Sequence, residues 1–270
     1  MLKLRILTAL ILIPLVIVGI FYLSQWAFMV ITALITLLAA WEWSRLSGWI
    51  ELTRRSFFVG FQCVILLSLM VFPTPAKWVW MVLLGLLFWL ILSIYLLNAR
   101  RQPILPQIPS PVRVGLGWLI LTLCWAALQL LHLNPFYLLF MLLIIWLADT
   151  AAYVSGRLWG QHLLAPTLSP KKTWEGMIIG LVTTFFTAML IQTFFKGVKP
   201  YLWQIFVLVL LTSLASIAGD LFESQLKRLE GLKDSGHLLP GHGGILDRID
   251  SLLAAAPVFA GSLLLLGLAS

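Results

Sequence analysis

Charged residues are scarce in this chain. Its 270 residues include only 18 Lys and Arg and 10 Asp and Glu, whereas 61% are hydrophobic and the mean hydropathy is +1.02. A soluble domain cannot hide so much apolar surface, which excludes a soluble globular protein. The composition instead predicts a polytopic membrane protein, in which each crossing of the bilayer takes ~20 mostly apolar residues.

Cysteine is almost absent as well, and no segment is of low complexity. The only cysteines, Cys63 and Cys124, lie inside apolar runs, where thiols are usually small buried hydrophobic groups. Isolated thiols exclude a disulfide framework and a cysteine-rich metal motif, and no Cys/His pair has the spacing of zinc ligands. Without linkers or repeats, residues 1–270 are predicted to form a single membrane domain.

Long apolar runs account for most of the sequence. We count nine, at about 4–24, 26–43, 57–73, 78–97, 114–132, 135–148, 177–195, 201–222 and 251–269. Helices are the expected spanning form because hydrocarbon offers backbone polar groups no hydrogen-bond partners. The first run is long and lacks an obvious cleavage site, so we expect it to be retained and not to be a signal peptide. The predicted fold class is an all-α integral membrane protein, a polytopic bundle of about nine transmembrane helices.

The distribution of basic residues predicts the orientation. Nine spans would place fifteen of the 18 Lys and Arg on the side of the N-terminus, and only Lys77, Lys196 and Lys199 on the other. Since basic loops are retained in the cytoplasm, the N-terminus is expected to be cytoplasmic. All ten acidic residues fall on or near that side too. The net charge of +8 suits this bias or an anionic lipid surface, and we expect no nucleic-acid partner.

Charge gathers in one stretch, residues 219–250, between the last two apolar runs. Six of the ten acidic residues are there, together with basic residues and histidines: Asp220, Glu223, Glu230, Asp234, Asp247, Asp250, Lys227, Arg228, Lys233, Arg248, His237 and His242. Carboxylates, cations and a glycine-rich turn at this boundary indicate a metal and phosphate site at the membrane surface. We therefore interpret residues 1–148 mainly as scaffold and residues 149–270 as the catalytic half.

Helical spacing aligns polar residues at the end of the run 201–222. If the helix continues, Asp220, Glu223, Ser224 and Lys227 share one face. The alternative is a charged face that meets water. Asp220 favours a functional interpretation, because it closes an apolar run in which an unpaired carboxylate is costly.

A glycine-rich turn precedes the last apolar run. Residues 240–244 let the backbone bring N–H groups close to an anion, although many loops are rich in glycine. Asp247 and Asp250 follow on one face of the next helix, as site residues or as ordinary partners of a helix N-terminus. Antiparallel packing of consecutive spans would bring Asp220 and Asp247 together, where their carboxylates could hold Mg²⁺ against a triphosphate.

A third polar patch precedes the run 177–195. Asp149, Tyr153 and Arg157 are spaced to share a helix face. Residues 169–176 then bring lysines and hydroxyl groups to the start of a helix, at Ser169, Lys171, Lys172 and Thr173. Lysine is a flexible point charge for phosphates, although the same lysines could serve only as basic anchors. The glycines of a Walker motif are missing, which excludes a P-loop.

The stretch 224–250 carries a longer signature. It reads S-x-x-K-R-x4-K-D-x-G-x3-P-x-H-G-G-x-x-D-R-x-D without departure, at Ser224, Lys227, Arg228, Lys233, Asp234, Gly236, Pro240, His242, Gly243, Gly244, Asp247, Arg248 and Asp250. In this signature the chain resembles the bacterial phosphatidate cytidylyltransferases, also called CDP-diacylglycerol synthases. The resemblance extends back to about Asp149, whereas the residues before it share little more than hydropathy and length.

The resemblance implies that CTP and phosphatidate react to CDP-diacylglycerol and pyrophosphate with Mg²⁺, and it leaves a second cation open. It implies Asp220 and Asp247 as metal ligands and, as catalytic residues, Asp220, Lys227, Arg228, Lys233, Asp234, His242, Asp247, Arg248 and Asp250. The implied substrate-binding residues are Asp149, Ser169, Lys171, Lys172, Thr173, Ser224, Gly243 and Gly244. The resemblance also implies a homodimer in the bacterial cytoplasmic (inner) membrane, with the active site facing the cytoplasm.

Two other functions are open at this point. A CTP-dependent lipid kinase would transfer the γ-phosphate of CTP and release CDP in place of pyrophosphate. A transporter is disfavoured, because the ionisable residues gather at one face and not in the middle of the spans.

The phosphate of phosphatidate is already largely ionised, so cytidylyl transfer needs no strong general base. We therefore do not expect His242 to be an essential base, but to contact phosphate or a residue that does.

Overall fold

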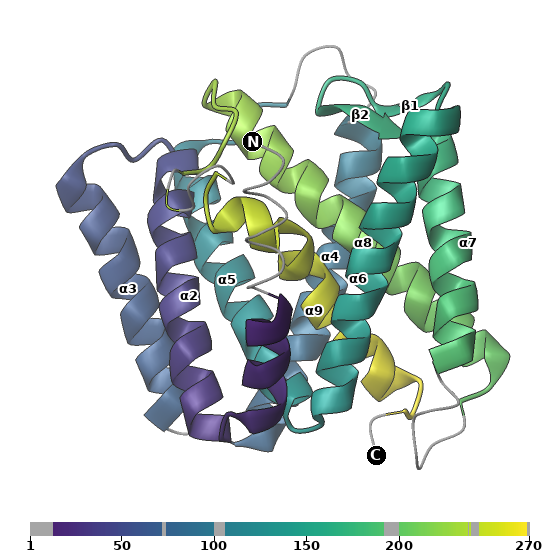
Figure 1. The fold of residues 1–270 in the computed structure, drawn as a ribbon. Helices are drawn as coiled ribbons and strands as arrows, with labels where there is room; N and C mark the ends of the chain where they lie inside the picture. Colours follow the sequence, from purple (N-terminus) through teal and green to yellow (C-terminus); the bar gives the residue numbers. More distant parts are fainter. Residues whose placement is uncertain are drawn as a thin grey trace.

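The computed structural model of the chain describes residues 13–71, 74–99, 106–191, 200–236, 238 and 243–268. These residues form a short apolar helix, Ile13–Tyr22, and eight long ones: α2 (Gln25–Leu46), α3 (Leu52–Val71), α4 (Pro75–Ala99), α5 (Ser110–His132), α6 (Pro135–Trp159), α7 (Trp174–Ile191), α8 (Leu202–Leu229) and α9 (Leu246–Leu265). A hairpin of β1 (Leu163–Ala165) and β2 (Ser169–Thr173) joins α6 to α7. All eight long helices are apolar and long enough to cross a membrane, which confirms the predicted all-α polytopic bundle (Figure 1).

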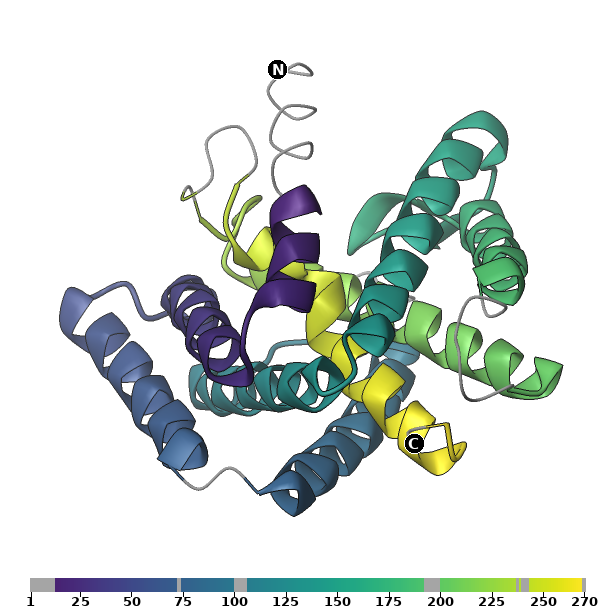
Figure 2. The same cartoon turned by 60° about the horizontal axis from the view of Figure 1, so that its bottom comes forward.

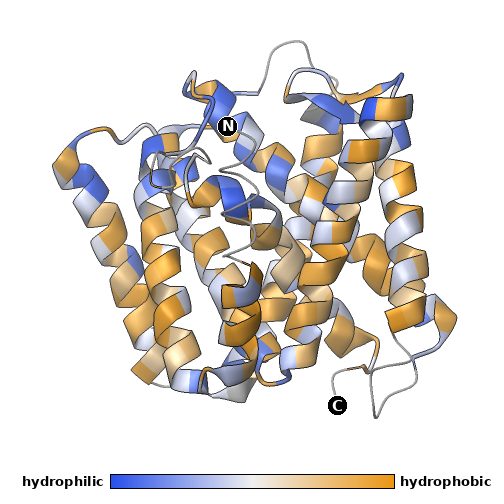
Figure 3. Ribbon diagram, in the orientation of Figure 1, coloured by the Kyte–Doolittle hydropathy of each residue, from blue (hydrophilic) through white to orange (hydrophobic). Residues whose placement is uncertain are grey.

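The helices run back and forth between two ends of the bundle (Figure 1). Hydrophilic residues gather at the end that holds β1, β2 and the segment between α8 and α9 (Figure 3). We call this the polar end. Large apolar side chains such as Trp80, Ile94 and Phe186 are exposed along the helices, as expected where lipid surrounds a protein.

Two helices continue beyond their apolar runs, as the helical spacing of the polar residues after each run indicated. The run 135–148 is the first part of α6, which continues to Trp159, and α8 continues beyond the end of its apolar run at residue 222 to Leu229. Both extensions carry basic residues in the last helical turn, where they complement the helix dipole. The extensions bring polar residues to the polar end on rigid helices. Residues 4–12 of the first predicted run, 4–24, lie outside the described residues.

The β1–β2 hairpin was not predicted from the sequence. Its strands pair antiparallel, with Leu163 opposite Thr173 and Ala165 opposite Ser169. Pro170 disfavours a helical conformation of Ser169, the residue before it. A strand of a two-stranded sheet is an edge strand, which tolerates proline. Helix α7 begins at Trp174, directly after β2.

The hairpin is fixed to its neighbours at both ends. The hydroxyl of Thr173 accepts the N–H of Gly176 at 3.2 Å in the first turn of α7. Ala165 and Leu168 pack against Leu221 of α8 in a small apolar cluster. The position of β2 is thereby set relative to α7 and α8.

Helix α9 is the central helix of the bundle. It packs against α2, α4, α5, α6 and α8 (Figure 2), and all of its residues 253–263 are buried. A helix that is apolar on every side belongs in a core. Small residues permit the close packing: a Cβ atom on Gly85 of α4 would lie 2.6 Å from Cβ of Pro257. The first turns of α9, with Asp247 and Asp250, therefore lie between neighbouring helices.

Glycines let helix backbones touch where the site forms. A Cβ atom on Gly219 of α8 would collide with the carbonyl oxygen of Asp250 in α9. One on Gly180 of α7 would lie 2.9 Å from the carbonyl oxygen of Ala148 in α6. Only glycine permits such close crossings, which are common between membrane helices. The first crossing sets Asp220, the next residue of α8, beside Asp250.

Candidate active site

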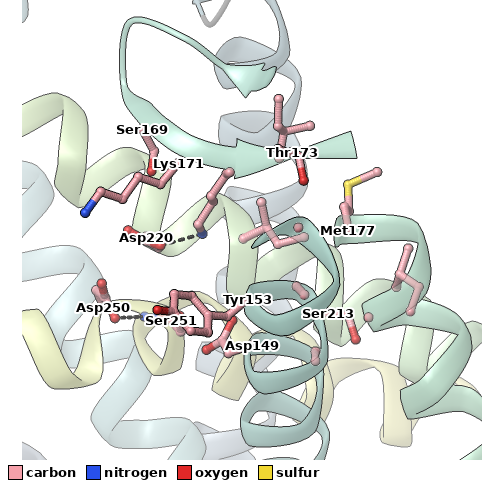
Figure 4. Close-up of a pocket in the computed structure, with 18 of the residues that line it drawn as sticks. Asp149, Tyr153, Ser169, Lys171, Thr173, Met177, Ser213, Asp220, Asp250 and Ser251 are labelled. Atoms are coloured by element: carbon pink, nitrogen blue, oxygen red, sulfur yellow. Dashed lines mark hydrogen bonds and ion pairs between the residues drawn. The ribbon is translucent and has the colours of Figure 1, made fainter. Parts of the chain in front are cut away.

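A cavity of about 680 Å³ lies between α6, α7, α8, α9 and β2 (Figure 4). Its charged lining consists of Asp149, Arg157, Lys171, Lys172, Asp220, Asp247 and Asp250. The three polar patches of the sequence therefore meet in one cavity, and Asp220 and Asp247 lie in it together, as predicted for consecutive antiparallel spans. Carboxylates and cations that converge in a space of this size suit a polar, charged ligand.

Lys172 of β2 forms an ion pair with Asp220 of α8, and the two side chains are 25% and 26% exposed. Asp220 also accepts a hydrogen bond from the Ser224 hydroxyl at 3.3 Å, one helical turn further along α8. Burial lowers the pKa of Lys172, but Asp220, Asp149 and Asp250 raise it more, so that it ends above its ordinary value of 10.5. Lys172 therefore carries a positive charge at neutral pH.

Lys227 of α8 lies between two carboxylates. Its Nζ donates to Glu223 Oε2 at 2.7 Å and to Asp247 Oδ1 at 2.8 Å. Glu223 is 1% exposed, so it needs a cation to offset its charge. The predicted face of Asp220, Glu223, Ser224 and Lys227 therefore contacts β2 through Asp220 and α9 through Lys227.

Asp247 is held from two sides. While its Oδ1 pairs with Lys227, its Oδ2 accepts the N–H of Gly244 at 2.8 Å and the N–H of Ser235 at 3.0 Å. Gly243, with φ at +83°, supplies the left-handed turn that this approach requires. The N–H of Gly244 thus faces a carboxylate of the protein itself, and anion binding by Gly243 and Gly244 stays a prediction.

Asp149 and Asp250 complete the acidic lining. Figure 4 shows Asp149 and Tyr153 of α6 opposite Asp250 and Ser251 of α9. Oδ1 of Asp250 accepts the N–H of Ser251 at 2.7 Å. Carboxylates from three helices therefore share this space with the ammonium group of Lys172.

Several predicted site residues lie outside the cavity lining. Arg228, Lys233, Asp234 and Arg248 are exposed at the polar end, and none of them lines the cavity. His242 falls outside the described residues. The cavity does bring together Asp149, Ser169, Lys171, Lys172, Thr173, Asp220, Asp247 and Asp250, and Ser224 and Lys227 bond to its walls. The individual roles of all these residues stay predictions.

Sequence reasoning missed Glu42, whose carboxylate lies at the start of α9. This residue of α2 is 2% exposed. It accepts the N–H groups of Ile245 and Leu246 at 3.0 and 2.7 Å and the hydroxyl of Ser235 at 3.0 Å. A signal was available, because Glu42 is the only acidic residue of the apolar run 26–43. Its partners could not be found from the sequence, because they lie up to 204 residues away along the chain.

A second link from the N-terminal half ends at the C-terminus of α8. Arg113 of α5 forms an ion pair with Glu230 and donates to the carbonyl oxygen of Leu46 at 2.8 Å. This link fixes the ends of α2, α5 and α8 to one another, at a distance from the cavity lining.

The acidic residues were predicted to hold Mg²⁺. Within the described part of the chain, no group of three or more His, Cys, Asp or Glu side chains is arranged to hold a metal ion. Mg²⁺ does not require such a cage, because it usually binds one or two carboxylates together with substrate phosphates and water. Asp220 and Asp247 line the same cavity, so the chemistry of the donors fits that kind of site.

Comparison with known proteins places the chain in a family. Residues 3–266 match the model of the Cytidylyltransferase family. A phosphatidate cytidylyltransferase of Pseudomonas aeruginosa is 37% identical over 271 residues, which cover 96% of each chain. One of Haemophilus influenzae is 32% identical over 289 residues, with 96% of this chain and 98% of the relative covered. One of Staphylococcus saprophyticus is 45% identical over 122 residues, 45% of this chain and 46% of the relative. Because the match spans nearly its whole length, the chain belongs to the cytidylyltransferase family of enzymes.

Proposed function

We propose that this enzyme transfers the cytidylyl group of CTP to phosphatidate, giving CDP-diacylglycerol and pyrophosphate. Relatives that align over nearly the whole chain carry the name phosphatidate cytidylyltransferase. The observation that carries the proposal is the cavity with carboxylates and cations at one end of a membrane-spanning bundle. At such a place a soluble nucleotide and a lipid phosphate can meet.

The reaction is a displacement at phosphorus. A phosphate oxygen of phosphatidate attacks the α-phosphorus of CTP, the bond from that phosphorus to the bridging oxygen breaks, and pyrophosphate leaves with the electron pair. Such a transfer depends on positioning and on neutralisation of charge, not on a covalent intermediate. The lipid phosphate is already largely ionised, so no general base is needed.

The basic residues of the cavity suit the binding of phosphates. Lys171, Lys172 and Arg157 line it from β2 and α6, and Lys227 approaches it from α8. In this proposal they hold the triphosphate of CTP and the phosphate of the lipid. The carboxylates keep the ammonium groups in place: Asp220 pairs with Lys172, while Glu223 and Asp247 pair with Lys227. Arg228, Lys233 and Arg248 are proposed to contact phosphates from the exposed side.

Asp220 and Asp247 would hold Mg²⁺ when the nucleotide is bound, and Asp234 and Asp250 would support them. Bound there, the ion supplies charge neutralisation on the phosphates of CTP. A second cation fits the same proposal, since Asp149 adds a further carboxylate to the lining.

The cavity also has an apolar side that suits a lipid. Met177, Leu181 and Ile217 line it together with the charged residues. We propose that phosphatidate enters sideways between helices, with its phosphate among the cations and its acyl chains still in the bilayer. CTP would enter from the aqueous side of the polar end.

The location proposed is the inner membrane of a bacterium, with the polar end in the cytoplasm. Support comes from the described basic residues, most of which lie in the loops and helix ends at the polar end. Basic segments remain on the cytoplasmic side of membranes. The homodimer implied by the family resemblance stays a prediction, which the mass of the detergent-purified protein by light scattering would check.

The test is a product assay on the purified chain with phosphatidate, labelled CTP and Mg²⁺, beside Asp220→Ala and Asp247→Ala. We expect pyrophosphate and a lipid that carries the cytidine label, both lost in the two variants and on chelation of the metal. Arg54→Gln serves as the control and should leave the rate unchanged, because among the described residues Arg54 pairs only with Glu51, on the exposed surface. CDP with a newly phosphorylated lipid would instead show the kinase reaction. Absence of turnover, with flux of a substrate across vesicles, would show a transporter.

A further inference from the structure

Glu42 and Asp247 both bind two segments of the chain, one at Ser235 and one at the start of α9. Ser235 donates its hydroxyl to Glu42 at 3.0 Å and its N–H to Asp247 at 3.0 Å. At the start of α9, Gly244 donates its N–H to Asp247 at 2.8 Å, and the next N–H, that of Ile245, goes to Glu42 at 3.0 Å. Ser235 and the residues that lead into α9 are therefore both bound by the same two carboxylates.

The packing around Glu42 explains two glycines of the signature. A Cβ atom on Gly236 would collide with Oε1 of Glu42, and one on Gly244 would collide with Oε2. Glu42 is 2% exposed, so its carboxylate fills space in the interior and cannot swing away into water. The glycines therefore leave room for a carboxylate of α2, in addition to any role in binding anions.

We propose that Glu42 is a positioning residue of the active site, which orients Asp247 through Ser235 and the start of α9, where both carboxylates bind. This inference rests on the proposed function, because cytidylyl transfer is the reaction whose rate Glu42 would affect. With Oδ2 of Asp247 fixed by two backbone N–H groups, its Oδ1 is directed at Lys227, 2.8 Å away. Glu42 keeps those N–H groups in place. The N-terminal half of the chain thereby contributes to the site, beyond its predicted role as scaffold.

A carboxylate is required for this role, because three donors converge on it. Its two oxygens accept the N–H groups of Ile245 and Leu246 and the hydroxyl of Ser235. A glutamine of the same shape has one acceptor oxygen, and its NH₂ group would face donors. A negative charge also complements the N-terminus of α9, which leaves its first N–H groups without partners in the helix.

The test compares Glu42→Gln with Glu230→Gln in the full-length, detergent-purified enzyme. Glu230 is the matched control, since it too joins the N-terminal half to the polar end, through Arg113, but it neither bonds to Ser235 or the start of α9 nor lines the cavity. The measurements are kcat/KM for CTP, the Mg²⁺ concentration for half-maximal rate, thermal unfolding, and amide hydrogen exchange of residues 243–250. Exchange needs neither substrate nor metal.

For Glu42→Gln we expect kcat/KM to fall about 10- to 100-fold, as for other residues that orient metal ligands, with a higher Mg²⁺ requirement. Exchange should accelerate at residues 243–250 while the protein stays folded at the assay temperature. Glu230→Gln should lower the unfolding temperature without changing the rate per folded molecule. A rate within twofold of wild type for Glu42→Gln, or unchanged exchange at residues 243–250, would overturn the proposal.

Ser235→Ala provides the test if Glu42→Gln does not fold. It removes the hydroxyl on Glu42 but keeps the backbone N–H on Asp247. We expect a fall in rate of about tenfold, the equivalent of one hydrogen bond to a charged group, again with faster exchange at residues 243–250. Wild-type rate and exchange in this variant would overturn the proposal.

A wild-type enzyme that makes no CDP-diacylglycerol would refute the proposed function instead, and hydrogen exchange would still decide whether Glu42 orders the start of α9.

Discussion

Lys227 and Asp247 join α8 to α9 by an ion pair in which Nζ and Oδ1 are 2.8 Å apart. The same ammonium group lies 2.7 Å from Glu223, a carboxylate that is almost fully buried. One cation thus offsets two negative charges between the helices that carry most of the proposed chemistry. Its loss should affect both the stability of the bundle and the reaction.

We predict that Lys227→Met lowers kcat/KM at least 100-fold and the free energy of unfolding by ~3–5 kcal/mol, the cost of leaving a buried charge without its partner. Adding Glu223→Gln to Lys227→Met should restore much of the stability, because it removes the uncompensated charge, but should restore no activity. Thermal unfolding and steady-state rates of the single and double variants measure the two effects separately. Full activity in the double variant would show that Lys227 serves only to neutralise Glu223.

Lys172 should act as a permanent cation in the site. Its pKa is raised in the folded protein, which therefore holds the proton more tightly than the unfolded chain does. The contribution of its charge to stability is full below the ordinary value of 10.5 and is lost as the pH rises through the raised pKa. We predict that Lys172→Met lowers kcat/KM about 10- to 100-fold, the effect of one hydrogen bond to a charged group.

The difference in stability between wild type and Lys172→Met should stay constant from about pH 6 to about pH 9 and shrink only at higher pH. Unfolding temperatures across this range provide the measurement, with Arg54→Gln as an exposed control. A difference that disappears near neutral pH would mean that Lys172 is not the cation described here.

Local patterns were sufficient to predict much of the site. The spacing of Asp220, Ser224 and Lys227 placed them on one helix face, and antiparallel spans brought Asp220 into the same cavity as Asp247 and Asp250. These inferences need only the helical period and the alternation of spans across the membrane. Both can be inferred from residues that lie close together in the sequence.

Contacts between distant segments were beyond such patterns. The β1–β2 hairpin has strands too short for a visible alternation, and its place depends on packing of Leu168 against α8. Glu42 is a single acidic residue in an apolar run, and no nearby residue indicates that Ser235 or the start of α9 is its partner. The pairing exists only because α9 passes beside α2 in the folded bundle.

Gly219 should be sensitive even to the smallest side chain. A Cβ atom there would collide with the carbonyl oxygen of Asp250, and a backbone atom cannot move aside without moving α9. We predict that Gly219→Ala lowers the free energy of unfolding by ~1–3 kcal/mol, the usual effect of overpacking, and reduces kcat because Asp220 shifts away from Asp250. Gly60→Ala is the control, since a Cβ on Gly60 of α3 has no atom within 4 Å. This variant should gain up to ~1 kcal/mol from helix propensity. Equal stability of the two variants would refute the close crossing of α8 and α9.

Sideways entry of the lipid makes a prediction about where a reactive substrate attaches. A phosphatidate with a photoreactive group near the start of one acyl chain should crosslink to the helices whose apolar residues line the cavity, at Met177, Leu181 or Ile217. Leu67 of α3 is the control, because it is exposed on a helix that packs mainly against α2 and α5 and contributes no residue to the cavity lining. Excess CDP-diacylglycerol, the lipid product, should reduce crosslinking at the cavity residues and not at Leu67, since only the cavity residues belong to a site that binds a headgroup. Peptide mapping of the crosslinked protein gives the positions. Attachment confined to loops of the polar end would mean that the lipid leaves the bilayer to react, and the apolar lining of the cavity would then need another explanation.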